Sequence, residues 1–191
     1  TRPALEADLA LLDAGWNDVA LQRLTARGSL PSRGDGRIEI RADALSQGQA
    51  RIASVALALD GRLDAARFTL DARGIALPQL PATASPAAGR FAATGAWRSE
   101  EAFARGELTL DALEATLPAL PEVRLAPPAR MAWRGAAWSL PAPVCVRLGE
   151  AGRVCAEGDA DDARAVGEAI DLAWVAPFLP ADRETPLAPT G

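Results

Sequence analysis

The sequence predicts an all-β fold, an antiparallel sheet laid down as a meander, and two observations lead there. Apolar and polar residues alternate in run after run, and almost no stretch has the spacing of a convincing helix. The alternation is clearest where Val55, Leu57 and Leu59 share one parity and, after a break, Phe68 and Leu70 share another. A period of two is typical of strands buried on one face only.

Length and composition fit one folded domain of this class. The chain has 191 residues, 49% of them hydrophobic, which is enough for a sizeable core. It carries 20 basic and 25 acidic residues, and every basic residue is arginine. Basic and acidic residues are interleaved along the same polar faces, whereas a nucleic-acid binder concentrates its basic charge in a stripe. We therefore expect no nucleic-acid partner.

The ends of the chain predict a single segment, residues 1–191, cut from a longer protein. The sequence begins at Thr1 without Met and finishes in the turn-like Pro189–Gly191. No apolar run approaches the roughly 18 residues of a membrane span, and the order of regions in a signal peptide is missing. We expect any export signal or anchor to lie outside this segment.

Strand candidates recur along the whole chain. The first one is ambiguous, because Leu5, Leu9 and Leu12 also suit a short helix, but its alternation favours a strand. Glycine, proline and short polar clusters separate the candidates. They are residues 5–11, 19–28, 36–43, two within 49–81, 91–97, 107–117, 129–133, 137–140 and 169–175.

Five local features complete the predicted path. Gly15–Asp18 is expected to form a turn, and Pro78–Ala88 a long connection. Ser99–Ala104 has a capping residue and the body of a short helix. A change of apolar parity near Ala112 predicts a β-bulge. Within Asp161–Pro180 we expect a short helix ahead of the last strand.

Cys145 and Cys155 are the pair of residues with the most definite chemical interpretation. They are symmetric about Glu150, so a hairpin that turns there sets them directly opposite each other. Opposed residues in a non-hydrogen-bonded antiparallel pair have Cα atoms about 4.5 Å apart, within reach of a disulfide. Their parity places them on the face of Arg147 and Arg153. The alternative is two reduced thiols, whereas a disulfide implies an oxidising compartment.

An enzyme is the least expected class. The chain has no His, Lys or Tyr, so a Ser or Cys nucleophile lacks its usual bases, and two cysteines without His make no zinc site. We expect no cofactor and no metal. Asp159, Asp161 and Asp162 are interpreted as an acidic turn, since their spacing does not fit an EF-hand loop. The five tryptophans are interpreted as core anchors: Trp16, Trp97, Trp133, Trp138 and Trp174.

The order of these segments resembles the middle-to-late part of the TamB family of AsmA-like repeating β-groove proteins. The likeness covers nearly the whole chain: 50–74, 95–97, 105–117, 125–138, the cysteine hairpin from Cys145 to Cys155, and 171–180. The resemblance implies an elongated, curled, β-taco-like sheet that forms an apolar trough. It also implies a periplasmic location, an anchor in the inner membrane, and an outer-membrane barrel partner, TamA, bound through parts outside this segment. The family is implicated in phospholipid movement and in outer-membrane biogenesis.

The energetics of apolar side chains also predict a trough. Leaving a Leu, Ile or Val exposed forgoes roughly 1.5 to 3 kcal/mol, so an apolar sheet face without helices must fold on itself or be covered by something apolar. Two hypotheses follow: a conduit for phospholipid acyl chains, or a closed β-sandwich that acts as a structural or chaperone-like module and pairs with client strands. The predicted groove residues are Ile38, Ile40, Val55, Leu57, Leu59, Phe68, Leu70, Phe91, Leu108, Leu110, Val144 and Val146.

Overall fold

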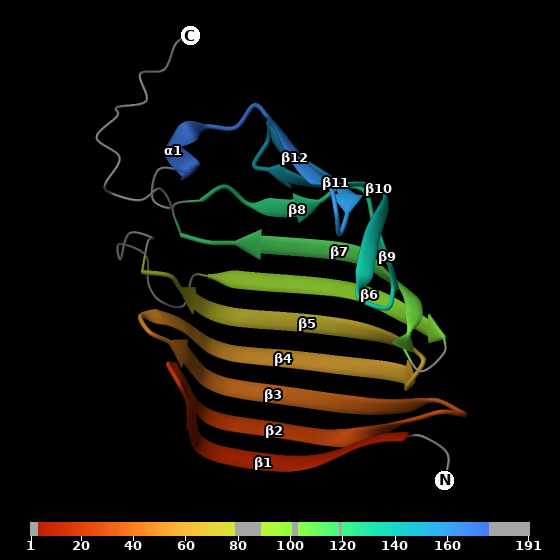
Figure 1. Ribbon diagram of the computed structural model, residues 1–191. Helices are drawn as coiled ribbons and strands as arrows, with labels where there is room; N and C mark the ends of the chain where they lie inside the picture. Colours follow the sequence, from red (N-terminus) through yellow and green to blue (C-terminus); the bar gives the residue numbers. More distant parts are fainter. Residues whose placement is uncertain (1–3, 79–88, 101–102, 119, 176–191) are drawn as a thin grey trace.

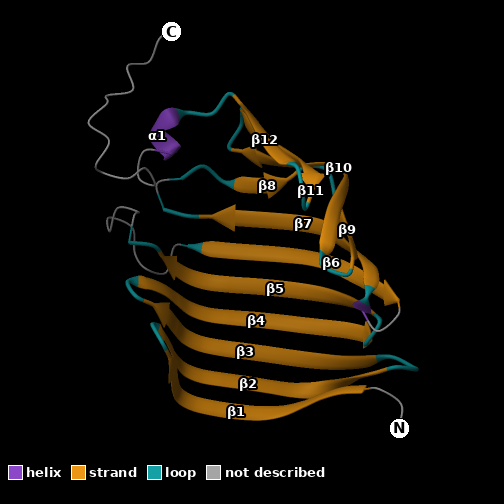
Figure 2. Ribbon diagram, viewed as in Figure 1, coloured by secondary structure: helices purple, strands orange, loops and turns teal. Residues whose placement is uncertain are grey.

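The chain folds into one twelve-stranded antiparallel sheet that curls along its length (Figure 1). The computed structural model describes residues 4–78, 89–100, 103–118 and 120–175. Strands account for nearly all of the regular structure (Figure 2). They are β1 (Ala4–Trp16), β2 (Val19–Pro31), β3 (Gly36–Gln47), β4 (Ala50–Arg62), β5 (Ala65–Ala76), β6 (Arg90–Glu100), β7 (Arg105–Thr116), β8 (Val123–Leu125), β9 (Ala129–Arg134), β10 (Ala137–Leu148), β11 (Gly152–Asp159) and β12 (Ala163–Glu168), followed by a four-residue helix, α1 (Leu172–Val175).

The predicted fold class, an all-β curled antiparallel sheet, is confirmed. Each strand from β1 to β7 pairs with the next, as in a meander. The ambiguous first segment is a strand, and it pairs with β2 along almost its whole length. The predicted bulge near Ala112 lies at Asp111, because Thr94 pairs with Ala112 while Gly95 pairs with Leu110. An extra residue at that point explains the change of apolar parity along β7.

Prolines interrupt the sheet after β7. Strands β8 and β9 share one position between β7 and β10, and Pro127 and Pro128 separate them. Across from this break, the register of β10 against β11 shifts between Leu140 and Val144, where Pro141 and Pro143 lie. Proline has no N–H to donate to the hydrogen-bond ladder of a sheet. The pairing of β10 is therefore interrupted at the same level on both of its sides.

A crease crosses five strands near one end of the sheet. It consists of residues that drop out of otherwise continuous pairing: Asp13, Gln22, Ala44, Ala53 and Gly74. Three of them have left-handed backbone, with φ of 48° at Asp13, 53° at Ala44 and 66° at Gly74. The apolar residues also change parity here, from Ile40 and Ala42 to Leu45 in β3. In Figure 1 the lower strands bend near this end, so the crease helps to curl the sheet.

Two local predictions differ from the structure. Ser99 and Glu100 end β6 instead of capping a helix, because Ser99 pairs with Gly106 and its N–H donates to the carbonyl of Asp64 at 2.7 Å. Residues 101–102 lie outside the described part, and Phe103 lies in a 3₁₀ turn, so the helical structure within the predicted range is confined to that turn. After Asp161 the order is reversed: β12 comes first, since Ala163–Glu168 pairs with the edge of β11, and α1 follows.

Three smaller differences concern the bounds of elements. The first turn is shorter than Gly15–Asp18, since β1 runs through Trp16. The strand predicted at 137–140 continues to Leu148. Most of the predicted connection, residues 79–88, lies outside the described part of the chain.

The hydrophobic core is small and lies at one end of the strands. Leu30, Ile38 and Ala66 form it, with Leu63 and Trp97 packed against them. The indole N–H of Trp97 donates to the carbonyl of Leu63 at 3.3 Å. Among the described residues, Leu30 and Ile38 are the largest side chains that are fully buried. This burial fits a single-layer sheet, since a closed sandwich buries the inner faces of both its sheets.

Candidate functional site

Cross-strand pairing aligns the apolar residues of β3 to β7 in three rows on one face. Because directly paired residues point to the same side of a sheet, each row runs across the strands. We call these rows the apolar floor. They are Ile38, Leu59, Phe68, Gly95 and Leu110; Ile40, Leu57, Leu70, Ala93 and Leu113; and Ala42, Val55, Ala72, Phe91 and Ala115.

One row of the floor continues in both directions. Towards β1 it runs through Leu24 and Leu11, and past β7 it runs through Val123, Leu148 and Gly152. Ten strands contribute to it, so at a spacing of about 4.8 Å it extends roughly 43 Å along the curled sheet. A long apolar path therefore lies perpendicular to the strands.

The structure brings most of the predicted groove residues together. Nine of them lie in the three rows, and Leu108 pairs with Trp97 beside them. Val146 and Val144 lie farther along, beyond β8. Val146 pairs with Leu125 and Val154, and Val144 pairs with Ala156. The pairing of β8 with both neighbours makes the face of Val146 continuous with that of the rows.

Sequence reasoning missed several members of this face. Leu24 and Ala26 extend it onto β2, and Leu113, Met131 and Val154 extend it onto later strands. The alternation within residues 19–28 carried a signal for Leu24 and Ala26. The face of Leu113 and Met131 could not be predicted from alternation alone. Leu113 follows the bulge of β7, and the position of Met131 depends on the pairing of β9 with β7.

Most of the large side chains of the floor are only half-buried. Ile38 is 1% exposed, whereas Leu57, Leu59, Phe68 and Leu70 are all of intermediate exposure. Among the described residues no second sheet packs over them, since all twelve strands belong to one sheet. The floor therefore keeps apolar surface in contact with solvent.

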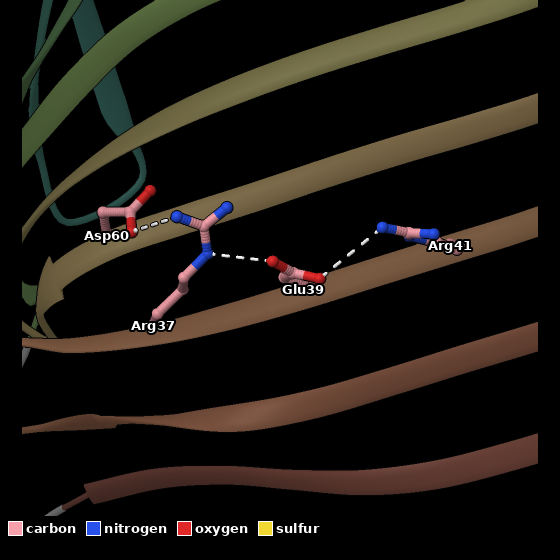
Figure 3. Close-up of polar contacts among 4 residues, drawn as sticks. All are labelled: Arg37, Glu39, Arg41 and Asp60. Atoms are coloured by element: carbon pink, nitrogen blue, oxygen red, sulfur yellow. Dashed lines mark hydrogen bonds and ion pairs between the residues drawn. The ribbon is translucent and has the colours of Figure 1, made fainter.

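The opposite face is polar and carries ion pairs. Arg37 contacts Glu39 at 3.0 Å and Asp60 at 3.2 Å, and Arg41 lies 3.7 Å from Glu39 (Figure 3). These side chains are largely exposed, so each pair contributes about 0 to 1 kcal/mol. The alternation that places Ile38 and Ile40 on the floor places their neighbours Arg37, Glu39 and Arg41 on this polar face.

The carboxylate of Asp71 also contacts two arginines on the polar face. Arg73 contacts it at 2.5 Å and Arg90 at 3.0 Å. Partial burial alone would raise the pKa of Asp71, but hydrogen bonds and charges of Arg73 and Arg90 hold that pKa below its ordinary value.

Cys145 and Cys155 pair directly across the β10–β11 hairpin, as predicted. Their Cα atoms lie 4.0 Å apart and their sulfur atoms are at disulfide distance. Arg153 donates a hydrogen bond to Sγ of Cys145 at 3.2 Å, so the pair is on the arginine face. The bridge closes the hairpin from the side opposite the apolar floor.

The acidic residues after β11 form a local turn. Oδ1 of Asp159 accepts the backbone N–H groups of Asp161 at 3.0 Å and Asp162 at 3.1 Å. These two bonds hold the pKa of Asp159 below its ordinary value. Within the described ranges, no group of three or more Cys, Asp or Glu side chains is arranged to hold a metal ion.

Two further findings bear on function. No helix in the described part of the chain has the length and apolar character needed to span a membrane. The chain matches no family model, and searches of curated proteins and of solved structures give no significant match.

Proposed function

We propose that this chain is a segment of a TamB-like hydrophobic groove that carries phospholipid acyl chains across the periplasm and so supports outer-membrane biogenesis. The observation that carries the proposal is the apolar floor: continuous rows of half-exposed Leu, Ile, Val and Phe side chains that run perpendicular to the strands. Such a surface fits a long, flexible, apolar ligand laid along the rows. Under the same proposal, TamA binds parts of the full-length protein outside this segment.

Energetics support transport by sliding. An acyl chain of about 15 methylenes gains on the order of 12 kcal/mol when it leaves water for an apolar surface, at about 0.8 kcal/mol each. It gains nearly the same in a bilayer, so the net free energy of moving from membrane to groove is small. A floor without fixed polar partners then holds the chain out of water while leaving it free to move along the rows.

A second candidate function rests on β1. The described part of the chain has six large hydrophobic residues that are exposed, and four of them lie on this edge strand: Leu5, Leu9, Leu11 and Leu12. In the described part of the chain only β2 pairs with β1, and an open sheet edge with apolar side chains is suited to accept another strand. This observation favours a chaperone-like module that pairs with client strands during outer-membrane protein assembly.

Photo-crosslinking separates the two functions. Leu70 and Thr69 are neighbours on β5 that point to opposite faces, one on the floor and one exposed on the polar face. We expect p-benzoyl-phenylalanine at position 70 to label phospholipid from vesicles of phosphatidylethanolamine and phosphatidylglycerol, and the same probe at position 69 to label little. Equal labelling at both positions, or none at position 70, would contradict the conduit.

A further inference from the structure

The chain reverses after β12 and returns over the apolar face of β10 to β12. Ala169 has a left-handed φ of 50° at the reversal, and α1 follows it. A Cβ atom added to Gly167 would fall 3.0 Å from Cγ1 of Ile170. One added to Gly152 would fall 3.0 Å from Cζ3 of Trp174. Ile170 and Trp174 therefore lie above two glycines of the sheet.

Strand register fixes which face these glycines belong to. Gly152 pairs with Leu148, which pairs with Val123 of β8. Gly167 pairs with Val154, which pairs with Val146. All of these partners share the face of the apolar floor, while Cys145, Cys155 and the arginines of this hairpin lie on the other side. The two glycines are positions in the floor without a side chain, and Ile170 and Trp174 cover them.

The covering segment is short, and the two hydrogen bonds that the structure shows for it join its own residues. The backbone N–H of Ala173 donates to Oδ1 of Asp171 at 2.9 Å, and that of Trp174 donates to the carbonyl of Asp171 at 3.0 Å. Ile170 and Trp174 are only half-buried. A helix of four residues has little stability of its own, so its place depends on these apolar contacts.

We propose that the surface around Gly152 and Gly167 is an acyl-chain subsite of the floor, which Ile170 and Trp174 occupy until a lipid chain displaces them. The inference rests on the proposed function. The two side chains cover the kind of surface that an acyl chain would cover, so the acyl chain and these side chains cannot occupy it at the same time. A lipid chain can then bind there only after the segment opens. The apparent affinity equals the intrinsic affinity multiplied by the fraction of molecules in which the segment is open.

The test compares one variant with a matched control at two probe positions. Trp174→Ala removes the larger covering side chain, and Val166→Ala removes an exposed apolar side chain on the other face of β12, opposite Cys155. The photo-crosslinker stands at position 154 beside the subsite, or at position 70 far from it. With phosphatidylethanolamine and phosphatidylglycerol vesicles, we expect Trp174→Ala to raise labelling at position 154 by roughly three- to tenfold, because the segment is then open in a larger fraction of molecules. Val166→Ala should leave it unchanged, and neither variant should alter labelling at position 70.

The failures of the two proposals are distinguishable. Unchanged or lower labelling at position 154 in Trp174→Ala, with normal labelling at position 70, overturns the subsite and leaves the conduit standing. No labelling at either position in any variant overturns the conduit and the subsite with it. Hydrogen exchange on the unaltered chain adds a check that needs no substitution: vesicles should lower amide protection of residues 170–175, and equal or higher protection overturns the displacement.

Discussion

The ring of Phe68 lies over Gly95 of the neighbouring strand. The two residues pair directly across β5 and β6, and a Cβ atom on Gly95 would fall 2.7 Å from ring atoms Cε1 and Cζ. Trp133 covers Gly106 in the same manner, with its indole N–H donating to the carbonyl of Phe103 at 3.0 Å. Aromatic rings laid over glycines close gaps in the apolar face and cover exposed backbone.

Gly95→Ala should destabilise the fold. The added methyl would meet the ring of Phe68 and would also lie 2.2 Å from the carbonyl oxygen of Thr109, a backbone atom that cannot move aside alone. Overpacking of this kind costs typically about 1 to 3 kcal/mol in the free energy of unfolding. Urea unfolding measures it, with Gly15→Ala as the control, since there the nearest atom lies at 3.7 Å. Equal stability of the two variants would contradict the close packing of the ring.

Asp71→Asn should lower stability at neutral pH and make no difference in acid. The pKa of Asp71 is lowered in the folded chain, so its contribution is present above the unfolded pKa near 3.9 and is lost as pH falls through the lower folded value. Because both arginines are exposed, we expect a loss of only about 0.2 to 1 kcal/mol at pH 7. Unfolding by urea at pH 7 and near pH 2 checks it. A deficit that persists unchanged in acid would show that the ion pairs are not its source.

Replacing both Cys145 and Cys155 by Ser should cost about 2 to 3 kcal/mol, because the bridge closes a short loop in the unfolded chain. The comparison is a melting curve of the oxidised chain beside that of the double variant. Reducing agent should lower the melting temperature of the oxidised chain nearly to that of the double variant. It should leave the melting temperature of the double variant unchanged. Full thiol labelling of unreduced protein made in the periplasm would rule out the bridge.

Small-angle scattering tests the curled single layer. A compact chain of this length has a radius of gyration of roughly 16 Å, and an elongated sheet should exceed that clearly. The control is the same measurement in denaturant, which gives the radius of gyration of the unfolded chain as an upper limit. A native value that fits a compact sphere would favour a closed sandwich.

The strand pattern and the hairpin of Cys145 and Cys155 could be predicted from the sequence, because both depend on alternation and symmetry within short stretches. The predictions that failed depend on which other segment each stretch pairs with, and the pattern within one stretch does not show that. Ser99 has the residue type of a helix cap, yet its pairing with Gly106 and its bond to Asp64 hold it in a strand. Residues 163–168 become a strand because the edge of β11 is there to pair with.

The crease is a second feature that the pattern of single strands does not predict. Parity changes at Ala44 and Gly74 are visible in the sequence one strand at a time. Their alignment across β1 to β5 appears only when the register of all five strands is known. The residues over Gly152 and Gly167 were equally hidden, because periodicity within a strand says nothing about a later segment that folds back over it.

A charge in the middle of the floor tests the central claim most directly. Leu57 is half-buried, pairs with Ile40 and Leu70, and lies apart from the small core around Leu30. If the floor is open, the carboxylate of Leu57→Asp reaches water in the empty groove, but an acyl chain laid over it would bury an unpaired charge at high cost. Thr94→Asp, on the polar face of β6, is the control for an added charge, and Leu30→Asp is the control for a charge in the core.

The measurement is photo-crosslinking to phospholipid from position 70, made beside a melting curve of each variant. We predict that Leu57→Asp melts close to the unaltered chain and loses most of its lipid labelling, that Thr94→Asp keeps both, and that Leu30→Asp unfolds. A Leu57→Asp chain that stays folded and labels lipid normally, or that unfolds as Leu30→Asp does, would contradict an open acyl-chain groove.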